Sequence, residues 1–450
     1  MCDTILASPD TTAQLAMLFG KNSDRQRNEA QLVEHVPAVD YVSGTQLKCT
    51  YISIPQVART HAAFFSRPFW TWGVEMGANE CCVAIGNEGV QARSPAPEEG
   101  ALTGLDLVRL GLERAATAAQ AVEVMTDLLK QYGQGGNCGH LTPAYYNNSF
   151  MIADATDAFV LETVGCEWVL ERVRGVRSIS NTYSIGGSAE RISAGLPAVI
   201  RDFGWNGNTS CSYADVIADP QSQHIGHSGA RRARSTSLLS SQIGCLGVAN
   251  MMSILRDHEV AEQSHGRWHP QKEVKRTLCL HACTEDFPSQ TTGSMISELR
   301  TADSVHWVTG TAAPCLSIFK PLLMDVPLPS LGPPPTDRYD VRSLWWRHER
   351  LHRMALTGNF GELLDDIALE RDVLESSFRA RVRAVLSGGN ASARAFVIEQ
   401  CWQDAIEMED RWFARLEQGV SRDVSPYGAT WARMNEMAGM DACLWERENA

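Results

Sequence analysis

Short apolar runs separated by turn residues dominate the first third of the chain. Residues 4–7 and 15–20 flank the turn-rich segment SPDTT, which predicts a β-hairpin that begins almost at the N-terminus. Residues 81–85 form a third apolar run of strand length. Further along, residues 149–173 contain three strand-like segments, FMIADA, AFVLETV and WVLERV.

Segments with helical periodicity lie between these strands. Residues 105–115 have apolar positions at helical spacing, and Thr117 with Gln120 forms a capping box for a helix over residues 118–132. Two more helices are predicted near residues 231–242 and 248–258, followed by strand-like segments at 278–281, 304–309 and 316–319. This order favours layered sheets covered by helices, an α+β fold, over a regular βαβ alternation.

The periodicity breaks at residues 326–337, in the segment VPLPSLGPPPTD. Beyond it the chain is rich in Arg, Glu, Ala and Leu at helical spacing. We therefore predict a main domain over residues 2–325, a proline-rich connection over 326–337, and a C-terminal module of three or four helices over 338–450 that packs on the main domain. Its tryptophans are expected in the core rather than in a binding site: Trp345, Trp346, Trp402 and Trp412.

Composition argues against several classes of protein. The formal net charge of -13 disfavours nucleic acid and anionic membranes as partners, because both select for basic surfaces. No apolar run approaches the roughly 20 residues of a transmembrane helix, and the N-terminal segment does not look like a signal peptide. The 13 cysteines are an odd number without a framework spacing, which is typical of reduced thiols, so we expect a cytoplasmic protein.

Cys2 is the first candidate catalytic residue. Removal of Met1 would leave a thiol and a free α-amine on one residue. An α-amine titrates near ~8 and a free thiol near ~8.5, so the amine can act as the base for its own thiol. A cysteine at position two is usually incidental when taken alone, and the rest of the chain has to decide.

Polar residues gather where the predicted hairpin ends. In FGKNSDR, Lys21, Asn22 and Asp24 follow the second apolar run. If the two strands pair, Asp24 can approach the amine of Cys2. A polar turn at a strand end is the simpler interpretation of this segment alone.

Three other segments could contribute to a catalytic site. In EMGANE, Asn79 precedes a strand and could offer a backbone N–H to an oxyanion, and Asn181 in ISNTYSIG could offer a side-chain amide. In GARRARS, the cations Arg231, Arg232 and Arg234 cluster at a helix start, where a cation opposes the helix dipole and hints at an anionic partner. Ordinary turns and a solvated helix face are the alternatives.

A metal site is a further option that the sequence does not favour. Cys279, His281 and Cys283 alternate along a predicted strand and could share one face. A fourth ligand is missing from the pattern, and paired zinc ligands normally lie on turns, so a plain strand is the preferred interpretation. We therefore predict no metal and no other cofactor.

Together the segments resemble the secernin family. This family is a branch of the cysteine N-terminal-nucleophile hydrolases that includes dipeptidase-like enzymes, and it is distantly similar to bile salt hydrolase and penicillin V acylase. The resemblance runs in order through most of residues 2–321, and the C-terminal helices match more loosely. It rests on segments that include CDT (2–4), FGKNSDR (19–25), WGVEMGANE (72–80), AIGNEGV (84–90), NSFMIADA (148–155), SISN (178–181) and TGTAAPCLSIFKP (309–321).

The resemblance implies a four-layer αββα sandwich with Cys2 at the mouth of its sheets. Cys2 would attack an amide carbonyl, its α-amine would transfer the proton, and water would release the acyl-enzyme. Asp24 matches the acid that orients the amine, Asn79 matches the backbone oxyanion donor, and Asn181 matches the side-chain donor. The late active-site arginine matches Arg234 or Arg231.

We take Arg234 as catalytic, and Arg231, Lys21 and Asn22 as substrate-binding. The hydrolase relatives carry arginine at the position of Lys21; lysine keeps the charge but loses the planar fork. The cations in FGKNSDR and GARRARS predict a substrate carboxylate beside the scissile amide. The substrate would be a small peptide or an N-acyl amino acid.

Two other functions remain open. One is a regulatory protein that keeps the fold and acts through partners, because animal secernins are associated with regulated exocytosis. The other is acyl transfer to an amine by the same residues. The sequence also leaves homo-oligomerisation open.

Overall fold

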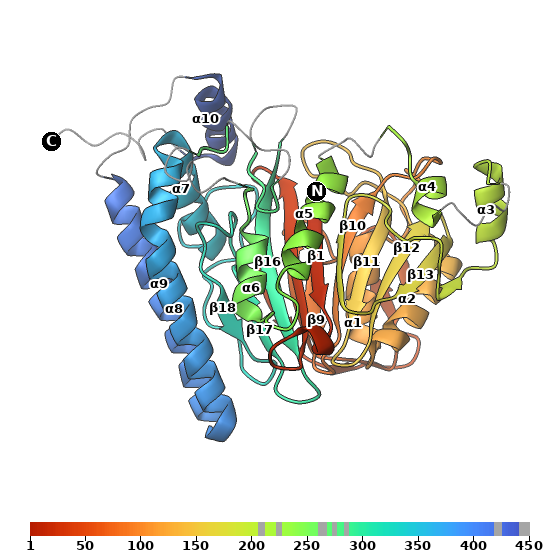
Figure 1. Cartoon of the computed structure of the whole chain (residues 1–450), viewed down its shortest axis with the longest axis horizontal. Coiled ribbons are helices and arrows are strands. Elements are labelled where there is room, and N and C mark those ends of the chain that lie inside the picture. The colour runs from red at the N-terminus through yellow and green to blue at the C-terminus, as the bar shows by residue number, and fades with distance from the viewer. Residues whose placement is uncertain are drawn as a thin grey trace. The chain divides into compact units, whose positions relative to one another are not determined.

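The computed structural model describes residues 1–205, 212–221, 227–259, 268–271, 277–282, 288–417 and 425–440 (Figure 1). The chain divides into two compact units. The first comprises Met1–Ser23, Val33–Ile254 and Ile296–Ser304, and the second comprises Asp24–Leu32, Leu255–Met295 and Val305–Ala450. The predicted connection at 326–337 therefore lies inside the second unit.

Two large sheets contain most of the strands. The six-stranded sheet has the order β14 (Val176–Ser180), β1 (Cys2–Ala7), β2 (Met17–Gln26), β16 (Ser289–Leu299), β17 (Val305–Val308), β18 (Lys320–Leu322). The eight-stranded sheet has the order β15 (Arg191–Ile192), β13 (Glu167–Arg172), β12 (Ala158–Val164), β11 (Asn147–Ala153), β10 (Ala84–Val90), β9 (Met76–Asn79), β8 (Ala63–Pro68), β3 (Gln31–Val36). Short strand pairs join β4 (Val39–Asp40) to β7 (Arg59–Thr60) and β5 (Gln46–Lys48) to β6 (Ser53–Pro55).

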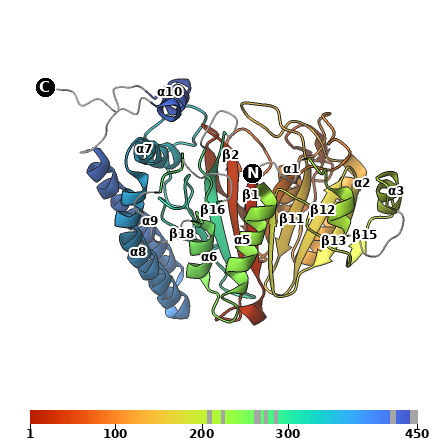
Figure 2. The same cartoon turned by 45° about the horizontal axis from the view of Figure 1, so that its top comes forward.

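Helices cover both sheets of the first unit. Helices α1 (Gly104–Arg114) and α2 (Ala118–Tyr132) pack on the eight-stranded sheet, while α5 (Ser228–Ser240) packs on β14 and β1. Figures 1 and 2 both show α5 lying against β1. Strand β1 in turn contacts β10 of the other sheet. The remaining helical segments there are η1 (Pro9–Thr11), α3 (Leu196–Asp202), α4 (Tyr213–Ile217) and α6 (Val248–Leu255).

These contacts confirm the predicted α+β class and, within the first unit, the order helix, sheet, sheet, helix. Every residue of β1, β11 and β12 is buried, as expected for strands covered on both faces. Helix α2 has the predicted bounds, and the Thr117 side chain accepts a hydrogen bond from the Gln120 N–H.

Three strand predictions need correction. Strand β2 continues to Gln26, so Lys21 and Asn22 lie within a strand rather than in the turn after it. Residues 278–281 do not form a strand; Leu280 and Thr291 exchange hydrogen bonds there, but no regular ladder continues. The predicted run at 316–319 precedes β18, which begins at Lys320.

The second unit contains the C-terminal helices. They are α7 (Leu344–Thr357), α8 (Phe360–Gly388), α9 (Ala391–Glu417) and α10 (Pro426–Ala438), and α8 and α9 pack on β18. The four tryptophans assigned to the core are at most 1% exposed, which confirms that prediction. Among the described residues no helix has the length and apolarity required to cross a membrane.

Candidate active site

Cys2 is the first residue of β1, which lies between β14 and β2 in the six-stranded sheet. Strand β1 pairs with β2 on one side, where Cys2 lies opposite Ser23, and with β14 on the other, where Asp3 lies opposite Ser180. Cys2 is 5% exposed, so the second residue of the chain is held in place by two neighbouring strands. Alternation along β1 directs Cys2 and Thr4 to one face of the sheet and Asp3 to the other.

The described polar contacts of Cys2 involve an amide and a carboxylate. The backbone nitrogen of Cys2 donates to Oδ1 of Asn181 at 2.6 Å, and Sγ lies 3.7 Å from Oε2 of Glu75. Asn181 directly follows β14, and its Nδ2 donates to the carbonyl of Gly89 at 2.9 Å. These contacts fix the amide so that its oxygen faces Cys2. The backbone nitrogen of Cys2 would be the α-amine once Met1 is removed.

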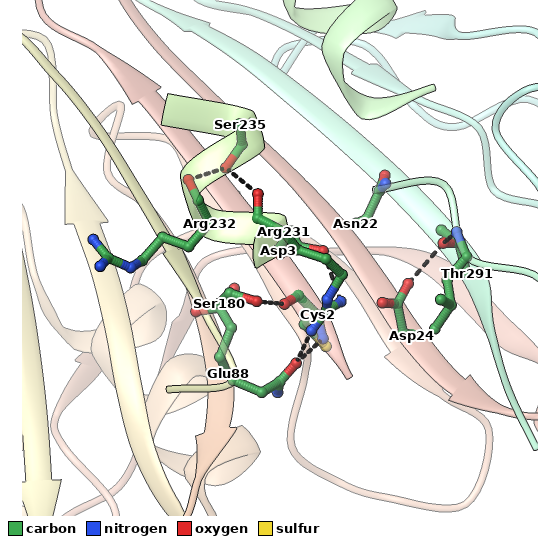
Figure 3. Close-up of polar contacts among 12 residues, drawn as sticks. Cys2, Asp3, Asn22, Asp24, Glu88, Ser180, Arg231, Arg232, Ser235 and Thr291 are labelled. Atoms are coloured by element: carbon green, nitrogen blue, oxygen red, sulfur yellow. Dashed lines mark hydrogen bonds and ion pairs between the residues drawn. The ribbon is translucent and has the colours of Figure 1, made fainter. Parts of the chain in front are cut away.

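Arg231 connects helix α5 to this site. Its Nη1 is 2.8 Å from Oδ2 of Asp3, and its Nη2 donates to Oδ1 of Asn181 at 2.7 Å (Figure 3). Arg231 and Asp3 are both fully buried, whereas Arg234 is half-buried. The buried face of α5 includes residues 231, 235 and 239, so the helix places Arg231, rather than Arg234, against Asn181.

Lys21 lies on the other side of β1, between the two sheets. Its Nζ donates to the carbonyl of Asn87 at 2.7 Å and lies 3.4 Å from Glu88 Oε1 and 3.8 Å from Glu75 Oε2. Thr4, opposite Lys21 in the sheet register, also donates to Glu88. The network is fully buried, so Lys21 has no exposed surface for a substrate carboxylate.

The charges of this network shift two pKa values. Burial alone would lower the pKa of Lys21, but the negative charges of Cys2, Glu88 and Glu75 outweigh it and raise that pKa. Burial raises the pKa of Glu88 to about 7 against the opposing effect of Lys21, since one ammonium is shared among three anionic groups. Gly86 permits this packing: a Cβ there would lie 2.5 Å from Cδ of Lys21.

The structure does not bring Asn79 to Cys2 in the predicted role. The backbone N–H of Asn79 donates to Val83, and its side chain caps the C-terminal end of α1 through the carbonyls of Leu112 and Ala115. Asn79 is also four residues beyond Glu75, which corresponds to roughly 13 Å along a strand. Its N–H is already used in the turn between β9 and β10.

The structure bears less directly on the predicted roles of Asp24 and Asn22. Asp24 belongs to the second unit, where its Oδ1 accepts a hydrogen bond from Thr291 at 2.7 Å. Asn22 is fully buried in β2, so its predicted contact with a substrate is not supported. The orienting role of Asp24 stays a prediction.

Sequence reasoning missed the carboxylates around Cys2. Glu75 and Glu88 lie within segments that carried the family resemblance, but their side chains were not singled out. A signal was present, because Glu88 interrupts a segment of mostly apolar or small residues, AIGNEGV, and Glu75 directly precedes another, MGAN. Asp3, the partner of Arg231, follows Cys2 directly.

A cavity is lined by sequence neighbours of Asn181 and Arg231, among them Thr182 and Ala230. It has a volume of about 440 Å³. Arg232 lines it, and Figure 3 shows that side chain pointing away from Cys2. The buried Nε of Arg232 has no hydrogen-bond partner among the described residues. The other lining residues are Tyr183, Ser184, Ser212, Ala214, Asp215, His227 and Gly229.

Residues 32–182, about a third of the chain, match the family model of peptidase family C69. This family contains secernin, so the predicted resemblance is confirmed for that segment. The match spans β9, β10 and Asn181.

Weak similarity to solved structures accompanies this match. A mutant conjugated bile acid hydrolase from Clostridium perfringens is 13% identical, with a TM-score of 0.39, over 68% of this chain and 88% of that chain. Penicillin V acylase from Agrobacterium tumefaciens is 12% identical, with a TM-score of 0.42, over 72% of this chain and 86% of that chain.

Replacement of Glu88 by Gln should change the pH dependence of stability. The unfolded chain releases the Glu88 proton near pH 4.5, whereas the folded protein holds it until about pH 7. The free energy of unfolding of wild type, relative to Glu88→Gln, should therefore fall as pH rises through this window, by on the order of 1 kcal/mol per pH unit. Denaturant titrations at several pH values measure this difference.

The exposed Glu98 provides the matched control. Glu98→Gln should track wild type at every pH. If the Glu88→Gln curve also runs parallel to wild type between pH 5 and 7, the buried carboxyl does not hold its proton as described.

Proposed function

We propose that this chain, whose residues 32–182 match peptidase family C69, is a cysteine-type amide hydrolase with Cys2 as its nucleophile after removal of Met1. The observation that carries the proposal is the hydrogen bond of 2.6 Å between the nitrogen of Cys2 and Oδ1 of Asn181 at the start of a buried strand. The contact gives the buried N–H of Cys2 the partner that any buried N–H requires, and it fixes the atom that would become the amine. A nucleophile whose own amine is the base needs such a contact.

The reaction would proceed through a thioester. The α-amine takes the proton of the Cys2 thiol, and the thiolate forms a C–S bond to the amide carbonyl. The resulting ammonium then gives its proton to the leaving nitrogen as the C–N bond breaks. Water, deprotonated by the same amine, hydrolyses the thioester and restores the thiol. Lys21 would stabilise the thiolate by charge, since both lie in the buried network.

Asn181 and Arg231 would position the amine. Oδ1 of Asn181 accepts from Cys2 and from Arg231, and Arg231 is held by its ion pair with Asp3. Arg231 is thus a positioning residue and not a substrate ligand. The second N–H of the Asn181 amide is our candidate for the oxyanion donor, and Asp24 remains the candidate for orienting the amine.

The substrate would occupy the cavity that Thr182 and Arg232 line. Lys21 and Arg231 are fully buried against carboxylates, so they cannot also bind a substrate carboxylate. Arg232 is the member of the arginine cluster that lines the cavity and has a buried N–H to offer. We therefore assign the substrate carboxylate to Arg232, which suits a small peptide or an N-acyl amino acid. The cytoplasmic setting expected from the cysteine content stays part of this proposal.

Substitution of Cys2 tests the nucleophile. We expect Cys2→Ala to lower the hydrolysis of peptide-like amides to below about one thousandth of wild type, because no other group can form the thioester. Cys2→Ser should keep weak activity at most, since serine is a poorer nucleophile with this base. Kinetics on a dipeptide and N-acyl amino acid panel measure this, with circular dichroism beside them.

Cys245→Ala, at an exposed free cysteine, is the matched control and should retain full activity. Full activity in a folded Cys2→Ala variant would move the site elsewhere. Wild type that cleaves none of the panel would favour the non-catalytic alternative.

Removal of the Arg232 side chain tests the substrate carboxylate. Loss of a hydrogen bond to a charged group costs about 1.5–3 kcal/mol, so Arg232→Ala should lower kcat/KM for free-acid substrates by roughly 10–100-fold. The matched substrate amides should be cleaved equally by wild type and variant. Arg234→Ala, on the same helix, is the control and should resemble wild type. Equal losses on acids and amides would make Arg232 structural.

A further inference from the structure

Four cysteine and histidine side chains of the second unit converge in its interior. They are His258, Cys279, His281 and Cys315, and their ligand atoms all lie within 4.8 Å of one another. His258 is 8% exposed and the other three are at most 1% exposed. All four belong to the second unit.

Hydrogen bonding does not explain how these groups are arranged. Nε2 of His281 lies 3.2 Å from Nε2 of His258 and 3.5 Å from the Sγ atoms of both Cys279 and Cys315. An imidazole nitrogen has either one N–H or one lone pair, directed along a single line in the ring plane. It can satisfy one of these three neighbours but not all of them.

A central ion does explain the spacing. Zinc binds histidine nitrogen at about 2.0–2.1 Å and cysteine sulfur at about 2.3 Å, and in a tetrahedron the ligand atoms are then roughly 3.3–3.8 Å apart. The three distances from His281 agree with this spacing within a few tenths of an ångström. Two sulfurs and two imidazoles also form a ligand set typical of zinc, and they disfavour magnesium and calcium, which prefer oxygen.

The surroundings of His281 are those of a metal ligand. Nδ1 of His281 lies 3.2 Å from Nε2 of His352, and Nδ1 of His352 lies 3.1 Å from Oε2 of Glu349. Glu349 is paired in turn with Arg353 at 3.0 Å. Such chains hold a ligating histidine in one tautomer and orientation. Burial opposes the charge of Glu349, yet His352 and Arg353 lower the pKa of this carboxyl to about 2.

We propose that His258, Cys279, His281 and Cys315 bind a structural Zn²⁺ ion. All four positions of the tetrahedron are filled by protein, and the rings of His258 and Trp268 stack with centroids 4.1 Å apart over the site. This closure leaves no position for a substrate or a catalytic water. The ion would join the irregular segment at 277–282 to His258 and Cys315. Among the described residues, no sheet ladder connects either residue to this segment.

Metal analysis of the full-length protein tests this proposal. Protein purified without chelators should contain one zinc ion per chain by mass spectrometry of the metal. Cys279→Ser and Cys315→Ser should lose most of this zinc and melt at lower temperature. Cys401→Ser is the matched control, because Cys401 is also fully buried but lies outside the cluster; it should keep the metal.

Cobalt substitution gives a second readout that does not depend on variants folding. Apo wild type titrated with Co²⁺ should develop the intense visible bands of a tetrahedral ion and a thiolate charge-transfer band in the near ultraviolet. Purified wild type without zinc that also gives no such spectrum would overturn the proposal, as would Cys315→Ser with an unchanged metal content. Neither readout depends on hydrolysis at Cys2.

Discussion

The described site depends on the hydrogen bonds of the Asn181 carboxamide. Its oxygen accepts hydrogen bonds from the nitrogen of Cys2 and from Arg231, and its nitrogen donates to Gly89 of the opposite sheet. One amide thus joins the first strand, a covering helix and the second sheet. Chain termini are normally poorly ordered unless they are tied down. Here the hydrogen bond to Asn181 is made by the nitrogen of Cys2, the atom that would become the catalytic base.

Buried charge forms the second constraint, and it acts on the two faces of β1 separately. On one face Arg231 and Asp3 neutralise each other without any exposed surface. On the other face a single ammonium, Lys21, serves Glu75, Glu88 and the thiol of Cys2. Burying these ions is costly unless each is paired. Because one cation serves three anionic groups, burial raises the pKa of Glu88 to about 7, and the network joins strands of both sheets.

Local patterns in the sequence predicted much of the fold. Thr117 and Gln120 gave the start of α2, and the alternating segments after residue 148 gave β11 to β13. Polar Lys21 and Asn22 ended the predicted strand too early, because their partners lie in distant segments that a local pattern does not reveal. Polar side chains such as Lys21 find their partners between the two sheets.

The remaining differences between the predicted and the described contacts have a tertiary origin. The choice between Arg231 and Arg234 depends on the rotation of α5 against β1 and β14. The role of Asn79 depends on whether its N–H is free after the turn forms, and it donates to Val83. The sequence pattern showed only Cys279 and His281 of the proposed zinc ligands, and Cys283, the third residue of that pattern, lies outside the described residues. His258 and Cys315 are too distant in the sequence to show a ligand spacing.

The most direct test of the central claim is the intact mass of active protein before and after limited treatment with a thiol alkylator, with the modified residue mapped by peptide sequencing. The account predicts a chain that lacks Met1 and loses activity in proportion to one alkyl group on an N-terminal Cys2. Active protein that retains Met1, or full activity with Cys2 alkylated, would contradict it.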